Sequence, residues 1–192
     1  KKIILELKYI YNYWNQKVNL ISRKDINNFY TRHILHSLSV KKLSIINESN
    51  TKIMDLGTGG GFPGIPLAIV YPKNTFYLID SKTKKIKILN EIIKEIKLPN
   101  VIAINERIEN EFQKVNFIVC RGVGDLKKIC KWGEKNIIKK NNNGFICFKG
   151  GNIDKELELL RKKHSIYRLK NYFSETFFET KKIICIPIKN RK

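Results

Sequence analysis

Apolar residues recur every three or four positions along the first part of the chain, which is the period of one face of an α-helix. The first stripe consists of Ile3, Ile4, Leu7, Ile10, Tyr11, Trp14 and Val18. A second stripe, between about residues 26 and 43, consists of Phe29, Tyr30, His33, Ile34, Leu38 and Leu43. Asp25 precedes this stripe as a candidate N-cap. Residues 1–50 are therefore predicted to form a helical layer, in which we interpret Tyr11 and Trp14 as packing residues.

From residue 52 onward, short apolar runs typical of buried strands alternate with longer amphipathic segments. The candidate strands are 53–56, 75–79, 101–105, 116–120 and 145–148, and the candidate helices are 63–70, 83–97, 125–139 and 153–163. Such alternation predicts parallel strands joined by helical crossovers. Two final β-like runs, 166–173 and 182–188, follow each other without a helical segment and predict an antiparallel hairpin. We therefore expect an α/β fold over residues 51–192 with a mostly parallel sheet, forming one compact unit with the helical layer.

The chain is strongly basic, with 38 Lys and Arg against 17 Asp and Glu among 192 residues and a formal net charge of +21. One interpretation is a polyanionic partner, most simply nucleic acid. The other is a coding sequence biased toward A and T, because only seven of the 38 basic residues are Arg while Asn and Ile are abundant. The sequence has no apolar run of the roughly 20 residues that a membrane span requires. We also find no secretory signal, so we expect a cytoplasmic protein with no membrane partner.

Four cysteines, at positions 120, 130, 147 and 185, are too widely spaced for a Cys-x-x-Cys pair. Three of them lie in apolar strand-like runs, where a free cysteine behaves as a small apolar residue. This usage predicts neither a zinc site nor a disulfide framework. We therefore expect no metal and a reducing compartment.

A glycine-rich segment between the first candidate strand and the helix after it is the candidate ligand-binding loop. Glycines permit positive φ and close approach of the backbone, and a helix N-terminus offers free N–H groups. A phosphate-binding P-loop is excluded, because no Lys-Ser/Thr pair follows the glycines. A dinucleotide fingerprint that starts at Gly57 requires glycine where Phe62 stands. One that starts at Gly59 reaches Gly64, but Pro63 then removes a backbone donor.

The spacing that fits without strain is Asp55-x-Gly57-x-Gly59-x-Gly61. It resembles the first motif of class I S-adenosylmethionine-dependent methyltransferases, which implies a Rossmann-like, seven-stranded fold and S-adenosylmethionine as cofactor. Asp80 follows the next candidate strand, about twenty residues after the loop. A carboxylate at that position accepts hydrogen bonds from ribose hydroxyls in either cofactor class. Together the loop and Asp80 predict a nucleoside-type cofactor.

Further residues make the resemblance specific. The loop continues as Phe-Pro-Gly-Ile-Pro through residue 66. Other matching residues are Trp14, Asn15, Asn19, Leu20, Arg32, His33, Ile34, Leu35, Ser37, Leu38, Asp80, Ser81, Lys85, Leu89, Arg121, Lys149 and Gly150. In this order, over about residues 9–188, the chain is similar to the bacterial small-subunit ribosomal RNA methyltransferase G family, also called glucose-inhibited division protein B.

The resemblance implies an enzyme that transfers the methyl group of S-adenosylmethionine to N7 of a guanosine in 16S ribosomal RNA. The RNA would be part of the small ribosomal subunit or its precursor, and we expect the protein to act as a monomer. The cofactor-binding residues it implies are Gly57, Gly59, Gly61, Phe62, Asp80, Ser81, Ile108, Glu109 and Arg121. Among these, Ile108 and Glu109 would lie beside the adenine. Their composition alone is equally consistent with an exposed charged loop.

Three positions depart from the family pattern. His36 stands where an acidic residue is usual, Gly122 where alanine is common, and Lys181 where arginine is expected. The change at His36 puts in doubt any role of a carboxylate at that position. The other two changes are compatible with the family reading.

Methylation of guanine N7 requires little of the protein beyond orienting the base against the methyl group. Guanine N7 already carries a lone pair, so neither a general base nor a metal is obligatory, and catalysis can rest on alignment with the sulfonium methyl. Arg121 and Lys149 follow adjacent strands at the carboxyl edge of the sheet, where ligands bind in open α/β folds. We expect them to hold the guanosine or its phosphate, with Asn19, Arg32 and His33 closing the pocket. Structural alternatives remain for three of them: a buried histidine at 33, a turn cap at 19 and a solvated lysine at 149.

Three other functions stay open from the residues alone. The first is a methyltransferase acting on another RNA, a protein or a small molecule. The segment after the fourth strand lacks the Asn/Asp-Pro-Pro-Tyr signature of exocyclic amine methylation. The second is a catalytically silent RNA-binding module, and the third is an oxidoreductase that uses a nicotinamide cofactor. Comparing the binding of the two cofactors distinguishes these functions.

Overall fold

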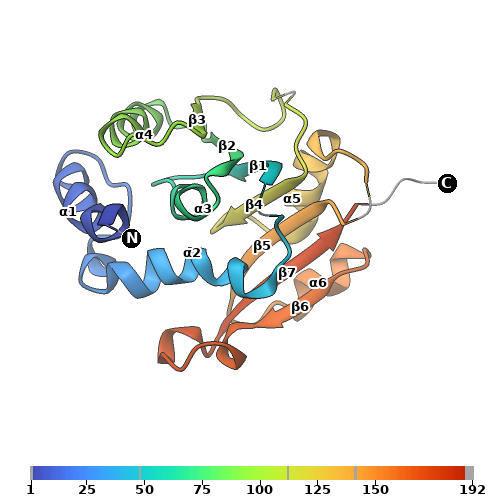
Figure 1. The fold of residues 1–192 in the computed structure, drawn as a ribbon. Coiled ribbons are helices and arrows are strands. Elements are labelled where there is room, and N and C mark those ends of the chain that lie inside the picture. The colour runs from blue at the N-terminus through green and yellow to red at the C-terminus, as the bar shows by residue number, and fades with distance from the viewer. Residues whose placement is uncertain (1, 48, 112, 141, 189–192) are drawn as a thin grey trace.

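The computed structural model describes residues 2–47, 49–111, 113–140 and 142–188, and within them the chain forms a seven-stranded sheet (Figure 1). The strands are β1 Ser49–Leu56, β2 Lys73–Ile79, β3 Val101–Ile104, β4 Phe117–Arg121, β5 Gly144–Gly150, β6 Ser165–Arg168 and β7 Lys181–Pro187. They lie in the order β3-β2-β1-β4-β5-β7-β6, the first five parallel. Strand β7 runs antiparallel between β5 and β6. The predicted mostly parallel sheet with an antiparallel C-terminal hairpin is confirmed.

Helices cover both faces of the central strands. They are α3 Gly64–Val70, α4 Thr83–Glu95, α5 Leu126–Gly133 and α6 Asp154–Leu160. In β4, Phe117 and Val119 join the apolar cluster that includes residues of α3 and α4, whereas Ile118 and Cys120 join the cluster that includes residues of α5 and α6. Successive side chains of a strand point to opposite faces, so a strand covered on both sides is apolar throughout. This explains the unbroken apolar runs in the sequence.

Two helices end earlier than their amphipathic patterns suggest. The helix predicted over 125–139 ends at Gly133, because Ile137 is extended and pairs with Val115 in a parallel bridge. The helix predicted over 153–163 ends at Leu160, where Arg161 adopts a φ of 48° and closes the last turn. Both helix ends are set by the backbone conformation, which the pattern of apolar and polar side chains does not indicate.

The N-terminal layer is helical but irregular after its first helix. Helix α1, Lys2–Lys17, matches the prediction. The predicted second helix over 26–43 is instead a succession of short turns: 3₁₀ at Arg23–Asn28, π at Tyr30–Leu35, α2 at His36–Leu38 and 3₁₀ at Ser39–Leu43. The expectation that Asp25 caps a helix is wrong, since it lies inside the 3₁₀ turn and its carboxylate binds the Arg32 side chain. A tertiary ion pair has replaced the local cap.

This layer packs on the same face of the sheet as α3 (Figure 1). Tyr11 is fully buried and its hydroxyl donates a hydrogen bond to the Gly60 carbonyl at 2.6 Å. Phe29 and Phe62 surround the same ring, with centroids 5.4 and 4.9 Å from it. Tyr11 is therefore the packing residue that the stripe predicted, and it also joins α1 to the glycine loop.

The C-terminal hairpin is shorter than predicted. Its first strand, expected over 166–173, ends at Arg168, because Leu169 is buried and begins a 3₁₀ turn. A second 3₁₀ turn at Thr176–Phe178 precedes β7. These turns bring Phe177 and Phe178 within 5.3 and 6.0 Å of the His36 ring, measured between centroids. The hairpin thereby reaches the N-terminal layer.

Across the described ranges, no helix is both long and apolar enough to cross a membrane. Nor do those residues contain a group of three or more His, Cys, Asp or Glu side chains that could hold a metal ion. All four cysteines are free, and Cys120, Cys130 and Cys147 are buried.

Candidate active site

The glycine loop leaves β1 at Leu56 and enters α3 at Gly64, as the sequence predicts. Gly57, Gly59 and Gly61 have φ values of 65°, 57° and 85°, a region that side chains other than glycine rarely adopt. A Cβ atom at Gly57 would lie 2.6 Å from Val123 Cγ2. The first glycine of the motif is therefore required both by conformation and by space.

Asp55 holds the loop in this shape. Its side chain is fully buried, and Oδ2 accepts hydrogen bonds from Thr58 Oγ1 at 2.7 Å and from the Gly64 N–H at 2.8 Å. Burial raises the pKa of Asp55 to about 6, although both hydrogen bonds act in the opposite direction. The spacing between Asp55 and the glycines thus has a structural explanation: one carboxylate bonds both the turn and the start of α3.

Asp80 lies at the end of β2, facing the same loop. Its Oδ2 accepts from the Gly59 N–H at 2.9 Å and its Oδ1 from the Lys82 N–H at 2.8 Å. Asn105, after β3, donates to the Asp80 carbonyl at 3.0 Å. The carboxylate is half-exposed, so lone pairs remain available for the hydroxyls of a ribose.

A cavity of about 190 Å³ opens between these elements. The residues that line it include Gly57, Asp80, Ser81, Ile108, Glu109 and Trp132. It combines a carboxylate with the apolar side chains of Ile108 and Trp132. This combination suits a nucleoside, because the carboxylate can bind the ribose hydroxyls and the apolar side chains can contact the flat base. Trp132 on α5 was missed by the sequence reasoning, because a single tryptophan on an amphipathic helix resembles a core residue.

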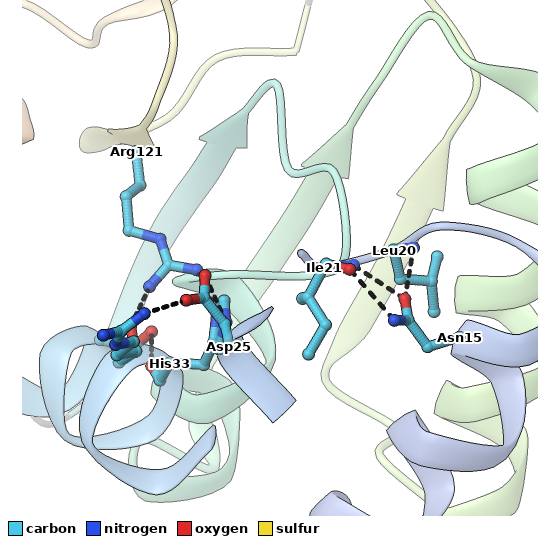
Figure 2. Close-up of polar contacts among 8 residues, drawn as sticks. Asn15, Leu20, Ile21, Asp25, His33 and Arg121 are labelled. Atoms are coloured by element: carbon cyan, nitrogen blue, oxygen red, sulfur yellow. Dashed lines mark hydrogen bonds and ion pairs between the residues drawn. The ribbon is translucent and has the colours of Figure 1, made fainter. Parts of the chain in front are cut away.

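A second group of polar side chains surrounds Arg121, at the carboxyl end of β4 (Figure 2). Its guanidinium donates to the Arg32 carbonyl at 2.9 Å and to His33 Nδ1 at 2.8 Å. The Phe62 ring of the glycine loop lies 5.3 Å from the Arg121 Cζ atom. Burial lowers the pKa of Arg121 to about 10, so the side chain keeps its charge at neutral pH. Arg121 therefore connects the cofactor loop to the N-terminal layer.

His33 is held in one tautomer by this arrangement. An arginine can only donate, so Nδ1 is the acceptor and the proton lies on Nε2. That buried Nε2 atom has no hydrogen-bond partner among the described residues, and its nearest carboxylate, Asp25 Oδ2, is 3.7 Å away. Burial and the charge of Arg121 lower the pKa of His33 to about 4. His33 is thus a neutral imidazole with a free donor.

These residues line a cavity of about 410 Å³. Its walls are Asp25, Arg32, His33, His36, Arg121, Phe177 and Lys181. Three cationic side chains outnumber the single carboxylate, and with two neutral histidines and one aromatic ring they suit an anionic ligand with a planar group. His36 is also buried, its Nε2 has no partner in the described chain, and burial keeps its pKa well below the usual range.

Comparison with known proteins identifies the enzyme class to which these two cavities belong. Residues 4–185 match the family described as rRNA small subunit methyltransferase G. The chain is 44% identical over 188 residues to the ribosomal RNA small subunit methyltransferase G of Christiangramia forsetii, covering 96% of this chain and 88% of that protein. For the Phocaeicola vulgatus protein of the same name, identity is 47% over 184 residues, covering 93% and 87%.

The chain belongs to the rRNA small subunit methyltransferase G family. It is an S-adenosylmethionine-dependent rRNA methyltransferase, as the resemblance implied. Solved structures show the shared fold: a SAM-dependent methyltransferase from Aquifex aeolicus has a TM-score of 0.61 at 15% identity, covering 88% of this chain and 100% of that one. A precorrin-6y C5,15-methyltransferase from Geobacter metallireducens has a TM-score of 0.59 at 12% identity, covering 88% and 91%.

The fold brings together only part of the substrate set predicted for this methyltransferase. Arg121, Arg32 and His33 line one cavity. Lys149 is directed elsewhere: its Nζ donates to the Gly124 carbonyl at 2.7 Å and forms an ion pair with Glu156 at 2.7 Å. Asn19 is exposed after α1, and among the described residues neither it nor Lys149 lines that cavity. Their roles remain predictions.

Asp25, Phe177, His36 and Lys181 enter the cavity without having been predicted there. Asp25 and Phe177 carried no signal, because an acidic residue before a helical stripe looks like a cap and a lone phenylalanine looks like core. His36 and Lys181 did carry one. Both were expected to depart from the family pattern, and both line this cavity.

The two buried histidines predict how stability of this methyltransferase depends on pH. Each has its folded pKa below the unfolded value of about 6.5, so the unfolded chain binds more protons as pH falls through that value. Stability is then lost on acidification: His33, with a folded pKa of about 4, contributes a loss of about 2 kcal/mol between pH 7 and pH 5, and His36 contributes a loss in the same direction. Asp55, whose pKa is raised to about 6, acts in the opposite sense and offsets part of this loss.

The variant His36→Phe tests this assignment, since an apolar ring fits among the phenylalanines around position 36. Chemical denaturation at pH 7 and pH 5 should show a smaller loss of unfolding free energy in the variant than in the unmodified protein. Equal losses would show that His36 does not titrate in this range.

Proposed function

We propose that this methyltransferase modifies N7 of a guanosine in 16S rRNA, within the small ribosomal subunit or its precursor. The observation that carries the proposal is the position of Arg121, which contacts Phe62 of the cofactor loop and lines the cationic cavity. A base bound in that cavity would lie beside the cofactor site. The high positive charge of the chain suits an RNA substrate, and we propose that the protein acts as a monomer in the cytoplasm.

The cofactor would be held by the cavity at the ends of β1 and β2. We propose that Asp80 binds the ribose hydroxyls and that Ile108 and Trp132 contact the faces or edge of the adenine. Gly57 leaves space that a side chain would fill. When bound, S-adenosylmethionine supplies an electrophilic methyl group.

The residues of the second cavity would orient the guanine. N7 needs no deprotonation before it attacks, which agrees with a pocket whose histidines are both neutral. The free His33 Nε2–H is a donor suited to the guanine O6, which lies next to N7 on the same edge. Asp25 would offset the positive charge that the ring acquires when N7 is methylated. We therefore propose catalysis by orientation and electrostatics, without a general base.

The aromatic and cationic walls would hold the rest of the nucleotide. Phe177 offers a ring on which a base extruded from its stack can lie. Arg32 and Lys181, whose charged groups lie 6.0 and 4.8 Å from the centroid of that ring, would contact phosphate. The helical layer of residues 1–50 and the methyltransferase domain of residues 51–192 would then act as one unit, because the cavity has walls from both.

Transfer of a labelled methyl group to small-subunit particles from a strain that lacks the enzyme tests the proposal. We expect label in 16S rRNA and chemical cleavage of the strand at N7-methylguanosine. Label on an exocyclic amine or a ribose oxygen would contradict the N7 chemistry. Absence of transfer by a protein that binds S-adenosylmethionine in calorimetry would contradict the substrate.

A further inference from the structure

The outer face of α1 carries large exposed side chains at a spacing of four residues. Leu5, Tyr9 and Tyr13 are 61%, 78% and 53% exposed, and four residues is about one helical turn. The opposite face of the same helix is buried through Leu7 and Tyr11. The packing of this helix is provided by its buried face and does not require two exposed tyrosines in line on the outer face.

A polar groove of about 460 Å³ runs between this helix and the Arg23–Asn28 turn. Its walls include Asn12 and Gln16 from α1, and Arg23 and Asn27 from the turn. Among the described residues, none of these four side chains makes a hydrogen bond or an ion pair with another part of the chain. They converge on one groove with donors and acceptors available for a ligand.

Asn15 sets the shape of the groove and takes no part in binding. Its side chain accepts from the Leu20 and Ile21 N–H groups at 2.8 and 3.0 Å and donates to the Ile21 carbonyl at 3.1 Å (Figure 2). All of its polar atoms are therefore engaged. The bonds join the end of α1 to the segment that precedes the turn, and so connect the two walls of the groove.

The surroundings of the groove are basic. Lys17 Nζ donates to the Tyr13 hydroxyl at 2.6 Å and lies 4.3 Å from the centroid of its ring. Lys8 lies on the same helix, whose single acidic residue is Glu6. Exposed aromatic rings interleaved with cations are the features that bind unpaired nucleic acid, and the net charge of +21 favours a polyanion over an ordinary protein surface.

One turn contributes residues both to the groove and to the substrate cavity. Asp25 of the Arg23–Asn28 turn lines the cavity that contains Arg121. Arg23 and Asn27, two positions to either side, line the groove. The groove is therefore within reach of nucleotides that adjoin a base bound in the cavity.

We propose that the groove and the tyrosine face of α1 bind unpaired nucleotides adjoining the target guanosine in the rRNA, an inference that rests on the proposed function. Bases stack on Tyr9 and Tyr13, the amides of Asn12 and Asn27 contact base edges, and Arg23 binds phosphate. This subsite orders the RNA and contributes to its affinity without touching the reacting atoms.

The test compares Tyr9→Ala/Tyr13→Ala with Tyr9→Phe/Tyr13→Phe. Filter binding to a protein-free 16S rRNA transcript and methylation of small-subunit particles are measured for both. The alanine pair raises Kd for the transcript and KM for the particle by about tenfold, with kcat changed less than about twofold. The phenylalanine pair keeps the stacking surface and stays near the unmodified values. Arg23→Ala weakens binding and lowers the salt dependence by about one phosphate contact.

The controls lie on the far helix α6. Leu159→Ala removes an exposed apolar side chain and Lys155→Ala an exposed charge, and both keep Kd and KM. Unchanged cofactor affinity and thermal stability show that the α1 variants are folded.

Unchanged Kd and KM in the alanine pair would contradict the proposed subsite. A higher KM on particles with unchanged Kd for the transcript assigns the face to a ribosomal protein, which also overturns it. If the unmodified protein fails to methylate the particles, the proposed function fails, whereas the transcript measurement still tests the surface.

Discussion

Replacing Arg121 by alanine is expected to lower the rate of methyl transfer by about a hundredfold or more. The guanidinium donates to the Arg32 carbonyl and to His33 Nδ1, and its Cζ atom lies 5.3 Å from the centroid of the Phe62 ring. Without it, His33 loses the bond that sets its tautomer, and the substrate cavity loses its contact with the cofactor loop. Single-turnover methylation of small-subunit particles measures the effect. Calorimetry and thermal unfolding show whether cofactor binding and the fold survive.

Two further arginine variants make this result specific. Arg168 lies exposed at the end of β6, and Arg168→Ala removes the same charge with no expected loss of rate. Arg121→Lys keeps the charge but cannot donate to two acceptors with a fixed fork, so its rate should remain well below that of the unmodified protein. Full activity of Arg121→Ala would remove this residue from the active site.

The substitution Gly57→Ala is expected to weaken S-adenosylmethionine binding by about a hundredfold. Its Cβ would lie 2.6 Å from Val123 Cγ2, and the φ of 65° is strained for any residue with a side chain. The loop must move away from Val123, and the cofactor cavity that it lines changes shape. Titration calorimetry measures the affinity directly.

Gly151→Ala isolates the cost of backbone strain. Gly151 has a φ of 69° and nothing within 4 Å of the position that a Cβ would take. This variant should be less stable by about 1 kcal/mol with unchanged cofactor affinity. The double variant Gly57→Ala/Val123→Ala should recover part of the lost affinity, because it removes the clash and leaves the strain. No recovery would mean that strain alone is responsible.

Two of the positions that were expected to depart from the family pattern, His36 and Lys181, line the substrate cavity. His36 is held neutral by burial among three phenylalanines. Lys181 lies 4.8 Å from the centroid of Phe177. The cavity therefore has a cation at position 181 and a neutral ring at position 36, and Asp25 is the acidic group among the described residues that line it.

The identity of the cofactor rested on the family resemblance, whereas the sequence by itself determined the alternation of strands and helices from residue 52 onward, the glycine loop and a nucleoside-type cofactor. These features follow from local rules: the period of apolar residues, the positive φ that Gly57 supplies, and the short distance from a strand end to the carboxylate of Asp80. Each of them acts within a few residues or across one pair of adjacent parallel strands. They can therefore be derived before the packing is known.

Only the tertiary structure decided which side chains form the substrate cavity. Asp25 was expected to cap a helix but binds the Arg32 side chain. Lys149 was expected to lie in the substrate pocket with Arg121 but forms an ion pair with Glu156. Phe177 came from the far end of the chain, carried by turns that the strand pattern did not show. A flexible charged side chain has several partners of similar energy, and packing between elements distant in sequence selects among them. These partners therefore cannot be predicted from a local pattern in the sequence.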